Sequence, residues 1–386
     1  MVGLYVHVPF CERRCHYCDF NTYLLRDGGV DEYLWALERE AELYGAVVAE
    51  RKVAFDTVFV GGGTPTVLDA CQLGRLFAAV RSHLPVREDA EVTVEANPGT
   101  LTGERLKALR DCGVNRISLG VQSLNDALLE RLGRIHSARD ARNCYDRARA
   151  MGFHNINIDL MFGLPGQDAG DWRKTLAQVI EWQPEHVSCY SLIVEEGTPF
   201  GRLYAQGQLP LPGEDEELSM YKLAIDLLAA AGYRHYEISN WSRPGFESRH
   251  NCIYWLNGQW LGLGPGAHSQ WAGERFANVR LPREYWRRLA RGERPVGWRE
   301  PVSREVEQED TVILGLRLRD GVDGRTFQRR FGVALEEVFG REVGRLLEMG
   351  MVEWRGHRLR LTERGLPVAN RAFEEFIRTP GQRTPA

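Results

Sequence analysis

Residues 2–18 read VGLYVHVPFCERRCHYC, an apolar run that is followed at once by Cys11, Cys15 and Cys18. The run is rich in valine and has a proline near its end, which is typical of a short strand that leads into a loop. A short loop with three thiols can wrap one metal centre, because soft thiolates bind iron–sulfur clusters and zinc well. Three thiolates would leave one iron of a four-iron cluster without a protein ligand. The spacing therefore predicts a [4Fe–4S] cluster with an open coordination position.

A structural zinc site, with His7 or His16 as its fourth ligand, is the alternative. Zinc motifs usually pair two separated ligand couples, and no second couple appears along the sequence. The remaining cysteines are scattered, and isolated cysteines are mostly small core residues. They are Cys71, Cys112, Cys144, Cys189 and Cys252. The cysteine spacing therefore favours an iron–sulfur cluster over a zinc site.

The iron without a protein ligand could bind one small molecule in particular. S-adenosylmethionine can chelate an iron through its amino and carboxylate groups. An electron from the cluster then breaks the sulfonium C–S bond and gives a 5′-deoxyadenosyl radical. We therefore predict S-adenosylmethionine as a second cofactor.

Strand-like runs alternate with helical patterns over roughly the first two-thirds of the chain. After the first run come TVFVGGG, EVTVEAN, NRISLGVQ, NINIDLMFG and HVSCYSL, which start at residues 57, 91, 115, 155 and 186. Six βα units in series predict a parallel sheet that curls into a barrel. We therefore predict an α/β fold, a partial (β/α)6 barrel over residues 1–232, with the active site where the strands end.

The pattern changes twice beyond the predicted barrel. Residues 233–300 hold an added strand and a stretch rich in glycine and tryptophan, which we assign to an extension of the barrel. Residues 301–378 combine helical runs with a hairpin pattern and a last helix, and they predict a small C-terminal helical domain of winged-helix type. Residues 379–386 (TPGQRTPA) are predicted to be disordered.

Charge and hydropathy narrow the range of partners. A net charge of −4 lacks the basic excess of most nucleic-acid-binding proteins, so we expect the C-terminal unit to pack on the barrel without nucleic acid. The first residues lack the pattern of a signal peptide, and no apolar stretch approaches the length of a membrane span. We expect a cytoplasmic protein with at most peripheral membrane contact, in which the thiols stay reduced.

Polar residues and glycines gather at the predicted strand ends. The glycines at 61–63 would let a ligand's amino group approach the backbone closely. Glu95, Gln122, Arg134 and Asp159 follow at later strand ends. Carboxylates suit ribose hydroxyls and a sulfonium cation, and an arginine suits a carboxylate. Each residue alone could make only a structural hydrogen bond, but their shared position favours one common ligand.

Several segments together resemble the oxygen-independent coproporphyrinogen III oxidase family of the radical S-adenosylmethionine superfamily. They are YVHVPFC, GGGTPT, EANP, GVQS, NIDLMFGLPGQ and GLGPGAHS, and the resemblance extends over nearly the whole chain. It implies that S-adenosylmethionine is contacted by Tyr5, Tyr17, Gly62, Gly63, Thr64, Glu95, Gln122, Arg134, Asp159 and Ala267.

The family contains coproporphyrinogen dehydrogenases and a branch of heme chaperones. The dehydrogenase motif resembles CxxxCxxCxC, but Phe20 stands here in place of the last cysteine. Dehydrogenases also carry a substantial segment before the cysteines, whereas ten residues precede Cys11 in this sequence. RHNCIYW, at residues 249–255, instead matches the HNxxYW motif of the chaperone branch. The resemblance to that branch implies heme contacts by His250, Asn251, Tyr254 and Trp255.

The chemistry of these residues fits such a contact. His250 offers an imidazole for axial coordination of heme iron, and Tyr254 and Trp255 offer flat apolar surface for the macrocycle. Arg249 could pair with a heme propionate. A histidine beside aromatic residues is often a structural residue instead, and this alternative stays open.

The resemblance implies a heme chaperone that carries a [4Fe–4S] cluster and S-adenosylmethionine and passes heme to an apo-hemoprotein, such as a respiratory enzyme. An electron donor is a further implied partner. The alternative is an oxygen-independent coproporphyrinogen III dehydrogenase, which converts two propionates to vinyl groups. The sequence assigns no catalytic residue and leaves open whether S-adenosylmethionine is cleaved in the functional cycle.

Overall fold

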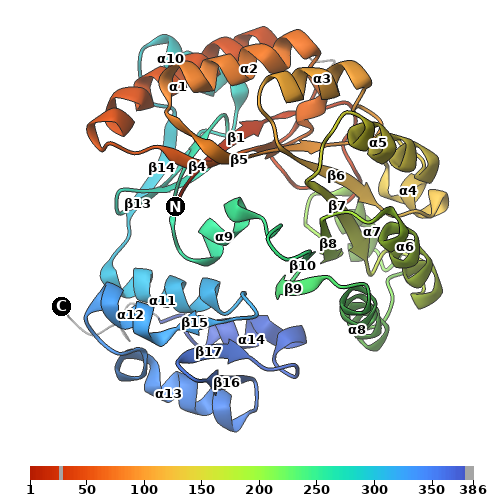
Figure 1. Ribbon diagram of the computed structural model, residues 1–386, viewed down its shortest axis with the longest axis vertical. Helices are drawn as coiled ribbons and strands as arrows, with labels where there is room; N and C mark the ends of the chain where they lie inside the picture. Colours follow the sequence, from red (N-terminus) through yellow and green to blue (C-terminus); the bar gives the residue numbers. More distant parts are fainter. Residues whose placement is uncertain (26–28, 379–386) are drawn as a thin grey trace.

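The computed structural model describes residues 1–25 and 29–378, so the tail predicted to be disordered (379–386) lies outside the described residues. The body is a twelve-stranded sheet that curves into an arc, with the strand order β14-β13-β12-β11-β1-β4-β5-β6-β7-β8-β10-β9 (Figure 1). Its strands are β1 (Val2–Val8), β4 (Phe55–Gly62), β5 (Val86–Ala96), β6 (Arg116–Gln122), β7 (Ile156–Phe162), β8 (His186–Ser191), β9 (Arg234–Glu237), β10 (Asn240–Ser242), β11 (Gln259–Leu263), β12 (His268–Trp271), β13 (Glu274–Asn278) and β14 (Val296–Pro301).

The centre of the sheet is parallel. Strand β1 pairs with β4, and the ladder continues through β5, β6, β7 and β8 with every neighbour parallel. Helices follow these strands and cover the outer face of the arc (Figure 1). They are α1 (Val30–Glu50), α2 (Ala70–His83), α3 (Gly103–Asp111), α4 (Asp126–Leu132), α5 (Ala138–Ala150), α6 (Ala169–Trp182), α7 (Pro199–Ala205) and α8 (Glu214–Ala230). The predicted α/β partial (β/α)6 barrel is confirmed.

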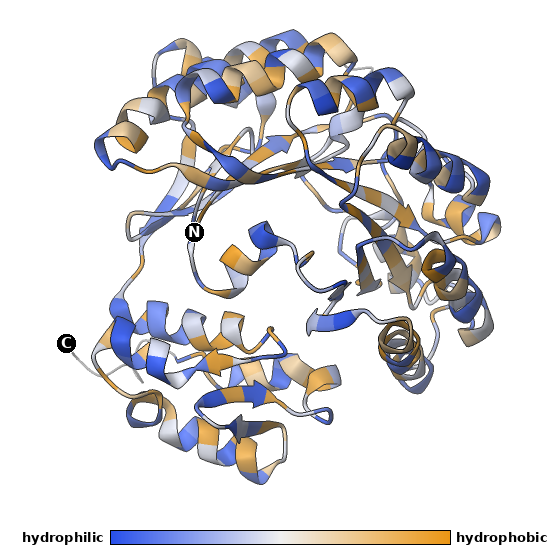
Figure 2. Cartoon of the chain, in the orientation of Figure 1, coloured by the Kyte–Doolittle hydropathy of each residue, from blue (hydrophilic) through white to orange (hydrophobic). Residues whose placement is uncertain are grey.

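Local chemistry explains where these elements begin and what they bury. Leu4, Val6 and Val8 of β1 are fully buried, and Figure 2 shows apolar residues along the central strands and polar residues on the helices outside. Several outer helices begin at a side chain that accepts a hydrogen bond from the helix's own first turn, which stabilises the start of a helix. These capping residues are Asp69, Thr102, Asn125, Ser137 and Asp168.

The segment predicted as a barrel extension joins the two ends of the arc. Strands β10 and β9 add antiparallel to β8, whereas β11 returns to the far side of β1 and pairs with it in parallel. Strands β12, β13 and β14 continue antiparallel from β11, and α10 (Pro282–Ala290) packs against α1. Between these two groups, α9 (Arg249–Trp255) crosses the hollow of the arc and contacts β1, β4 and β11 (Figure 1). The boundaries at residues 232 and 300 stay predictions, since one sheet runs across the first of them.

A small domain follows the barrel. A three-stranded antiparallel sheet, β15-β17-β16, packs with helices, as expected for a winged-helix type of domain. Its elements are α11 (Arg304–Gly315), β15 (Val322–Asp323), α12 (Gly324–Phe331), α13 (Leu335–Glu348), β16 (Val352–Arg355), β17 (Arg358–Leu361) and α14 (Ala369–Glu374). Helix α11 contacts α9, and the amide of Asn257 donates to the carbonyl of Glu307 at 3.1 Å.

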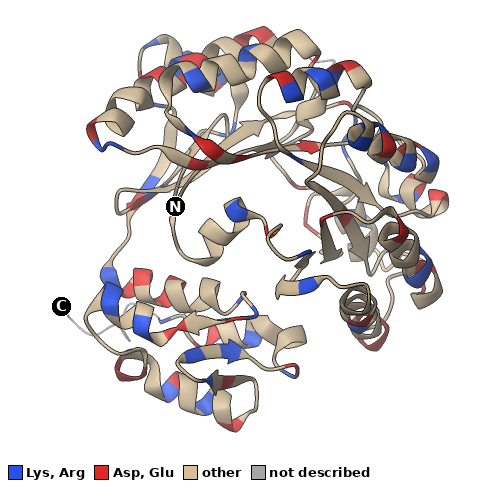
Figure 3. Ribbon diagram, viewed as in Figure 1, with Lys and Arg blue, Asp and Glu red and all other residues tan. Residues whose placement is uncertain are grey.

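Basic and acidic residues are interspersed over the outer helices and the C-terminal domain (Figure 3). Within residues 1–25 and 29–378, no helix combines the length and the apolar character that crossing a membrane requires.

Candidate functional site

The loop with the three cysteines lies at the end of the first barrel strand. Cys11 is buried in a short strand, β2 (Phe10–Cys11), which pairs with β3 (Tyr23–Leu24), and Cys15 and Cys18 are half-buried. His16 fixes the loop to the barrel, because its backbone N–H donates to the carbonyl of Leu132 at 3.0 Å. The loop is thus held both by the β2–β3 pair and by the rim of the barrel, where the parallel strands end.

The neighbourhood of the thiols decides how well the zinc alternative fits. Both ring nitrogens of His7 are already hydrogen-bonded, Nδ1 to the Tyr5 hydroxyl and Nε2 to the carbonyl of Asn21, each at 2.9 Å. Nδ1 of His16 lies 2.8 Å from the carbonyl of Arg131. In the described part of the chain, no three or more His, Cys, Asp or Glu side chains converge on one possible ion position. A four-iron cluster does not require the three thiolates to converge on one ion, since each thiolate binds a separate iron.

Arg134, which follows α4, contacts the cysteine loop. Its Nη1 donates to Cys15 Sγ at 3.4 Å, and its Nη2 donates to the carbonyl of Gly120 at 2.6 Å. Its Nε is buried and finds no hydrogen-bond partner among the residues described. A buried guanidinium N–H without a partner is unfavourable unless a ligand accepts from it. Arg134 therefore fits the predicted contact with a carboxylate.

The glycine turn after β4 holds the strand end against the cysteine loop. The backbone N–H of Gly63 donates to the carbonyl of Val8, and that of Thr64 to the carbonyl of Phe10, each at 2.8 Å. Gly62 has a φ of 105°, in the region that favours glycine. A Cβ added at Gly63 would lie 2.5 Å from the carbonyl oxygen of Phe10. Only glycine permits this approach, which leaves a cradle of bare backbone at the rim.

Two carboxylates lie inside the barrel below this cradle. Glu95 accepts from the backbone N–H of Gly62 at 3.0 Å, and burial together with the charge of Asp159 raises the pKa of Glu95 to about 7. Burial also raises the pKa of Asp159, which accepts from Ser118 and Asn157 at 2.8 Å each. A cationic or hydroxyl-rich ligand would stabilise the charged form of both groups.

Gln122 has an unusual backbone. Its φ of 67° lies in the left-handed region, which is strained for a residue with a side chain. A Cβ added at Gly120 would lie 3.1 Å from the Gln122 amide and 3.2 Å from Arg134 Nη2, so the two side chains flank the same turn. Strain of this kind is often found at functional sites. The strand end thus presents Gln122 and Arg134 together.

The inner cavity, defined by the residues below, is about 200 Å³ in volume. Tyr5, Glu95 and Asp159 line it together with His250, Asn251 and Tyr254, so the structure brings these predicted residues to one place. Its other walls are Phe59, Arg116, Ser118, Asn157, His186, Ser188 and Tyr190, which the sequence reasoning missed. A signal was present: Arg116/Ser118, Asn157/Asp159 and His186/Ser188 are polar residues two apart on three neighbouring strands, so each pair faces one side of the sheet.

His250 is sealed into the wall of the inner cavity. Its Nδ1 lies 2.7 Å from the Thr57 hydroxyl and its Nε2 lies 2.7 Å from the Tyr254 hydroxyl. The ring also stacks on Phe59 at 5.2 Å, and burial lowers the pKa of His250 to about 3. Both nitrogens are therefore occupied, as in a structural histidine. Heme coordination by His250 stays a prediction and requires one of these hydrogen bonds to open.

Some predicted residues lie away from both this cavity and the outer one described next. Tyr17 packs against an apolar cluster with Leu128 and Phe200. Trp255 lies under the guanidinium of Arg317, at 4.3 Å from the ring centroid, so it faces the C-terminal domain, and its contact with heme stays a prediction. Ala267 is 1% exposed, in the turn between β11 and β12.

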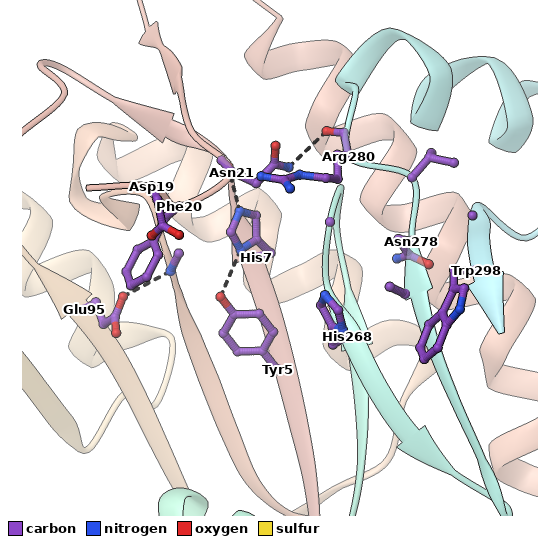
Figure 4. A pocket seen from close by; sticks show the side chains of 15 residues that line it. Tyr5, His7, Asp19, Phe20, Asn21, Glu95, His268, Asn278, Arg280 and Trp298 are labelled. Carbon is purple, nitrogen blue, oxygen red and sulfur yellow. Dashed lines mark hydrogen bonds between the residues drawn. The ribbon is translucent and has the colours of Figure 1, made fainter. Parts of the chain in front are cut away.

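The outer cavity is about 760 Å³ in volume and opens between β1, the cysteine loop and strands β12–β14. Figure 4 shows Tyr5, His7 and Glu95 on one side and His268, Asn278, Arg280 and Trp298 on the other. Tyr5 and Glu95 line both cavities. The sequence analysis singled out none of the residues of β12–β14, because their approach to β1 depends on the distant pairing of β11.

A cysteine loop after the first strand of a parallel partial barrel, with a glycine cradle after the second, defines the class of radical S-adenosylmethionine proteins. A model of the radical SAM superfamily matches residues 5–179, and a model of the HemN C-terminal domain matches residues 302–368.

Similar proteins narrow the class. The heme chaperone HemW of Bacillus subtilis is 40% identical over 378 residues, which cover 98% of this chain and 99% of that protein. HemW of Lactococcus lactis is 38% identical, with 97% of this chain and 96% of that protein covered. The solved coproporphyrinogen III oxidase HemN of Escherichia coli aligns with a TM-score of 0.85 at 25% identity, over 97% of this chain and 89% of that one. The chain belongs to the HemW branch of the coproporphyrinogen III oxidase family, which confirms the resemblance.

Proposed function

We propose that the protein is a heme chaperone, which binds heme and passes it to an apo-hemoprotein. The observation that carries this proposal is the match to HemW proteins over nearly the full length of both chains. Phe20 adds to it, because this exposed side chain stands where the dehydrogenase motif has a further cysteine and it lines the outer cavity. We expect a respiratory enzyme as a suitable recipient, and a cytoplasmic location without nucleic acid as a partner.

Cys11, Cys15 and Cys18 would hold a [4Fe–4S] cluster at the rim. The cluster, when bound with S-adenosylmethionine, supplies one-electron cleavage of a sulfonium bond. Arg134 beside the loop would donate its free Nε–H to the carboxylate of S-adenosylmethionine. The backbone cradle at residues 62–64 leaves room for the amino group.

Glu95, Asp159, Gln122 and Tyr5 would complete that binding site on the barrel side. A carboxylate with its pKa raised to about 7 is only partly charged at neutral pH, and a nearby cation returns it to the charged state. Glu95 and Asp159 are thus suited to accept hydrogen bonds from ribose hydroxyls and to face positive charge. An electron donor is required only if the cluster is reduced during the cycle.

Heme titration of the anaerobically reconstituted protein tests the proposal. We expect a stable Soret band that saturates at a defined stoichiometry, followed by loss of that band when an apo-hemoprotein is added and gains its own spectrum. Absence of a Soret band, or heme that never leaves for any recipient, would contradict the chaperone function.

The second candidate is coproporphyrinogen III dehydrogenase, which the HemN structure at a TM-score of 0.85 favours. Reduced protein incubated with coproporphyrinogen III and S-adenosylmethionine separates the two. A dehydrogenase forms protoporphyrinogen and consumes S-adenosylmethionine, whereas a chaperone leaves coproporphyrinogen unchanged.

A further inference from the structure

Four histidines line the walls of the two cavities, and they differ in what their rings can still bind. Both ring nitrogens of His7, His186 and His250 are hydrogen-bonded within the protein. His268, the first residue of β12, is exposed, and its backbone carbonyl accepts a hydrogen bond from the Trp260 indole at 3.0 Å. Across residues 1–25 and 29–378 no hydrogen bond to its ring is found. His268 is thus the ring with nitrogens free to coordinate a metal.

The surroundings of His268 suit a large flat ligand. Figure 4 shows its ring between Tyr5 and Trp298 in the outer cavity of about 760 Å³, a volume within the usual range for small-molecule sites. Trp298 is 47% exposed and Phe20 is 61% exposed, although both are large aromatic side chains. Exposed aromatic groups around a concave site indicate a ligand that covers them. A macrocycle offers a face of the matching shape.

Positive charge lies at one edge of the same cavity. Arg280 lines it and also lines an adjoining hollow of about 570 Å³, which Arg14 lines as well. Both arginines are exposed, and in the described ranges neither forms an ion pair with an acidic side chain. Phe20 and Asn21 are shared by the two hollows, so the charged edge is continuous with the aromatic walls. A ligand with carboxylates on one edge of an apolar plane matches this arrangement.

The protonation state of the imidazole agrees with this geometry. Burial and the positive charge of Arg280 lower the pKa of His268, which keeps its ring neutral at physiological pH. A neutral imidazole is the form that coordinates iron.

We propose that heme lies in the outer cavity with His268 as an axial ligand of the iron, its macrocycle against Trp298 and Phe20, and its propionates toward Arg280 and Arg14. The inference rests on the proposed function, since it requires that the protein binds heme. It places the cargo on the β12–β14 side of the outer cavity, opposite Tyr5, Gly62 and Glu95, which the proposed function assigns to S-adenosylmethionine.

Heme titration of four full-length proteins, all reconstituted with the cluster, tests this assignment. They are the wild type, His268→Ala, His250→Ala and His154→Ala, the last a matched control because His154 is exposed and does not line either cavity. We expect His268→Ala to weaken heme binding roughly tenfold or more and to shift the Soret maximum, while His154→Ala binds as the wild type does. Free imidazole should return the Soret maximum of His268→Ala toward that of the wild type.

The outcomes separate the inference from the function beneath it. No Soret band in the wild type overturns both. A wild-type Soret band that His268→Ala leaves unchanged in affinity and position overturns the assignment of His268 alone. Loss of the band only in His250→Ala, with native iron content and an unchanged circular dichroism spectrum, also overturns it and assigns the ligand to the inner cavity.

Discussion

The inner and the outer cavity share Tyr5 and Glu95 but are built in opposite ways. The inner cavity is small and is walled by side chains that bond one another, such as His250 with Thr57 and Tyr254. The outer cavity is more than three times larger, and His268, Arg280, Phe20 and Trp298 in its walls are exposed. Side chains that hydrogen-bond to one another make a site rigid, whereas side chains without a hydrogen-bond partner can bind a ligand. On the proposed function, the inner wall supports the site and the outer cavity receives the cargo.

The largest expected effect concerns the loop beside the outer cavity. Cys15→Ala removes one of three thiolates, and we expect iron and sulfide to fall close to zero because two thiolates hold a cubane poorly. Heme binding should persist in part, since His268, Trp298 and Arg280 lie on the β12–β14 side, away from the cysteine loop. Iron and sulfide assays run beside a heme titration check this. Full iron content in Cys15→Ala would remove the cysteine from the cluster.

The two histidines should differ next in their effect on stability. His250→Ala leaves the Thr57 and Tyr254 hydroxyls without a partner and opens a gap beside Phe59, so we expect a loss of about 2–4 kcal/mol in the free energy of unfolding. His268→Ala removes an exposed ring, and we expect a change within about 0.5 kcal/mol. Urea unfolding of both variants measures this. Equal losses would contradict the contrast between the two walls.

Glu95, at the boundary of the cavities, should make stability depend on pH. Its pKa is raised to about 7 in the folded state, above its ordinary value, so the folded protein holds a proton that the unfolded chain has released. Stability therefore falls as the pH rises from about 4.5 to 7, by up to about 3 kcal/mol from this group. Glu95→Gln should flatten that part of the pH profile relative to the wild type, as measured by urea unfolding at several pH values. An identical slope in both proteins would contradict the raised pKa.

The smallest effect should come from the charged edge of the outer cavity. Arg280→Gln should weaken heme binding about two- to fivefold, because an exposed ion pair to a propionate contributes little in water. The loss should shrink as salt is added, which screens the same interaction. Heme titration at two salt concentrations measures it, with Arg283→Gln as a control on an exposed arginine that lines neither cavity.

The sequence was informative wherever function depends on neighbours along the chain. The βα alternation and the cysteine loop after the first strand follow from local patterns, and the structure has both. The parallel return of β11 to β1 pairs residues more than 250 positions apart, such as Leu4 with Leu261, and no local pattern predicts it. That pairing brings His268 and Trp298 to the rim and lays α9 across the barrel. RHNCIYW alone suggests an available imidazole, because Thr57, whose hydroxyl is bonded to Nδ1 of His250, lies on β4, 193 positions away along the chain.

Helix α9 contacts both the barrel and the C-terminal domain. At one end of the helix, His250 lies in the wall of the inner cavity. At the other end, the Trp255 ring packs under the guanidinium of Arg317. Arg317 Nη2 also lies 3.7 Å from a carboxylate oxygen of Glu237 in β9. Both residues belong to one helix of seven residues. Because α9 contacts both parts, a displacement of the C-terminal domain would also move the wall of the inner cavity, so a recipient protein bound to that domain would act on the cavity from a distance.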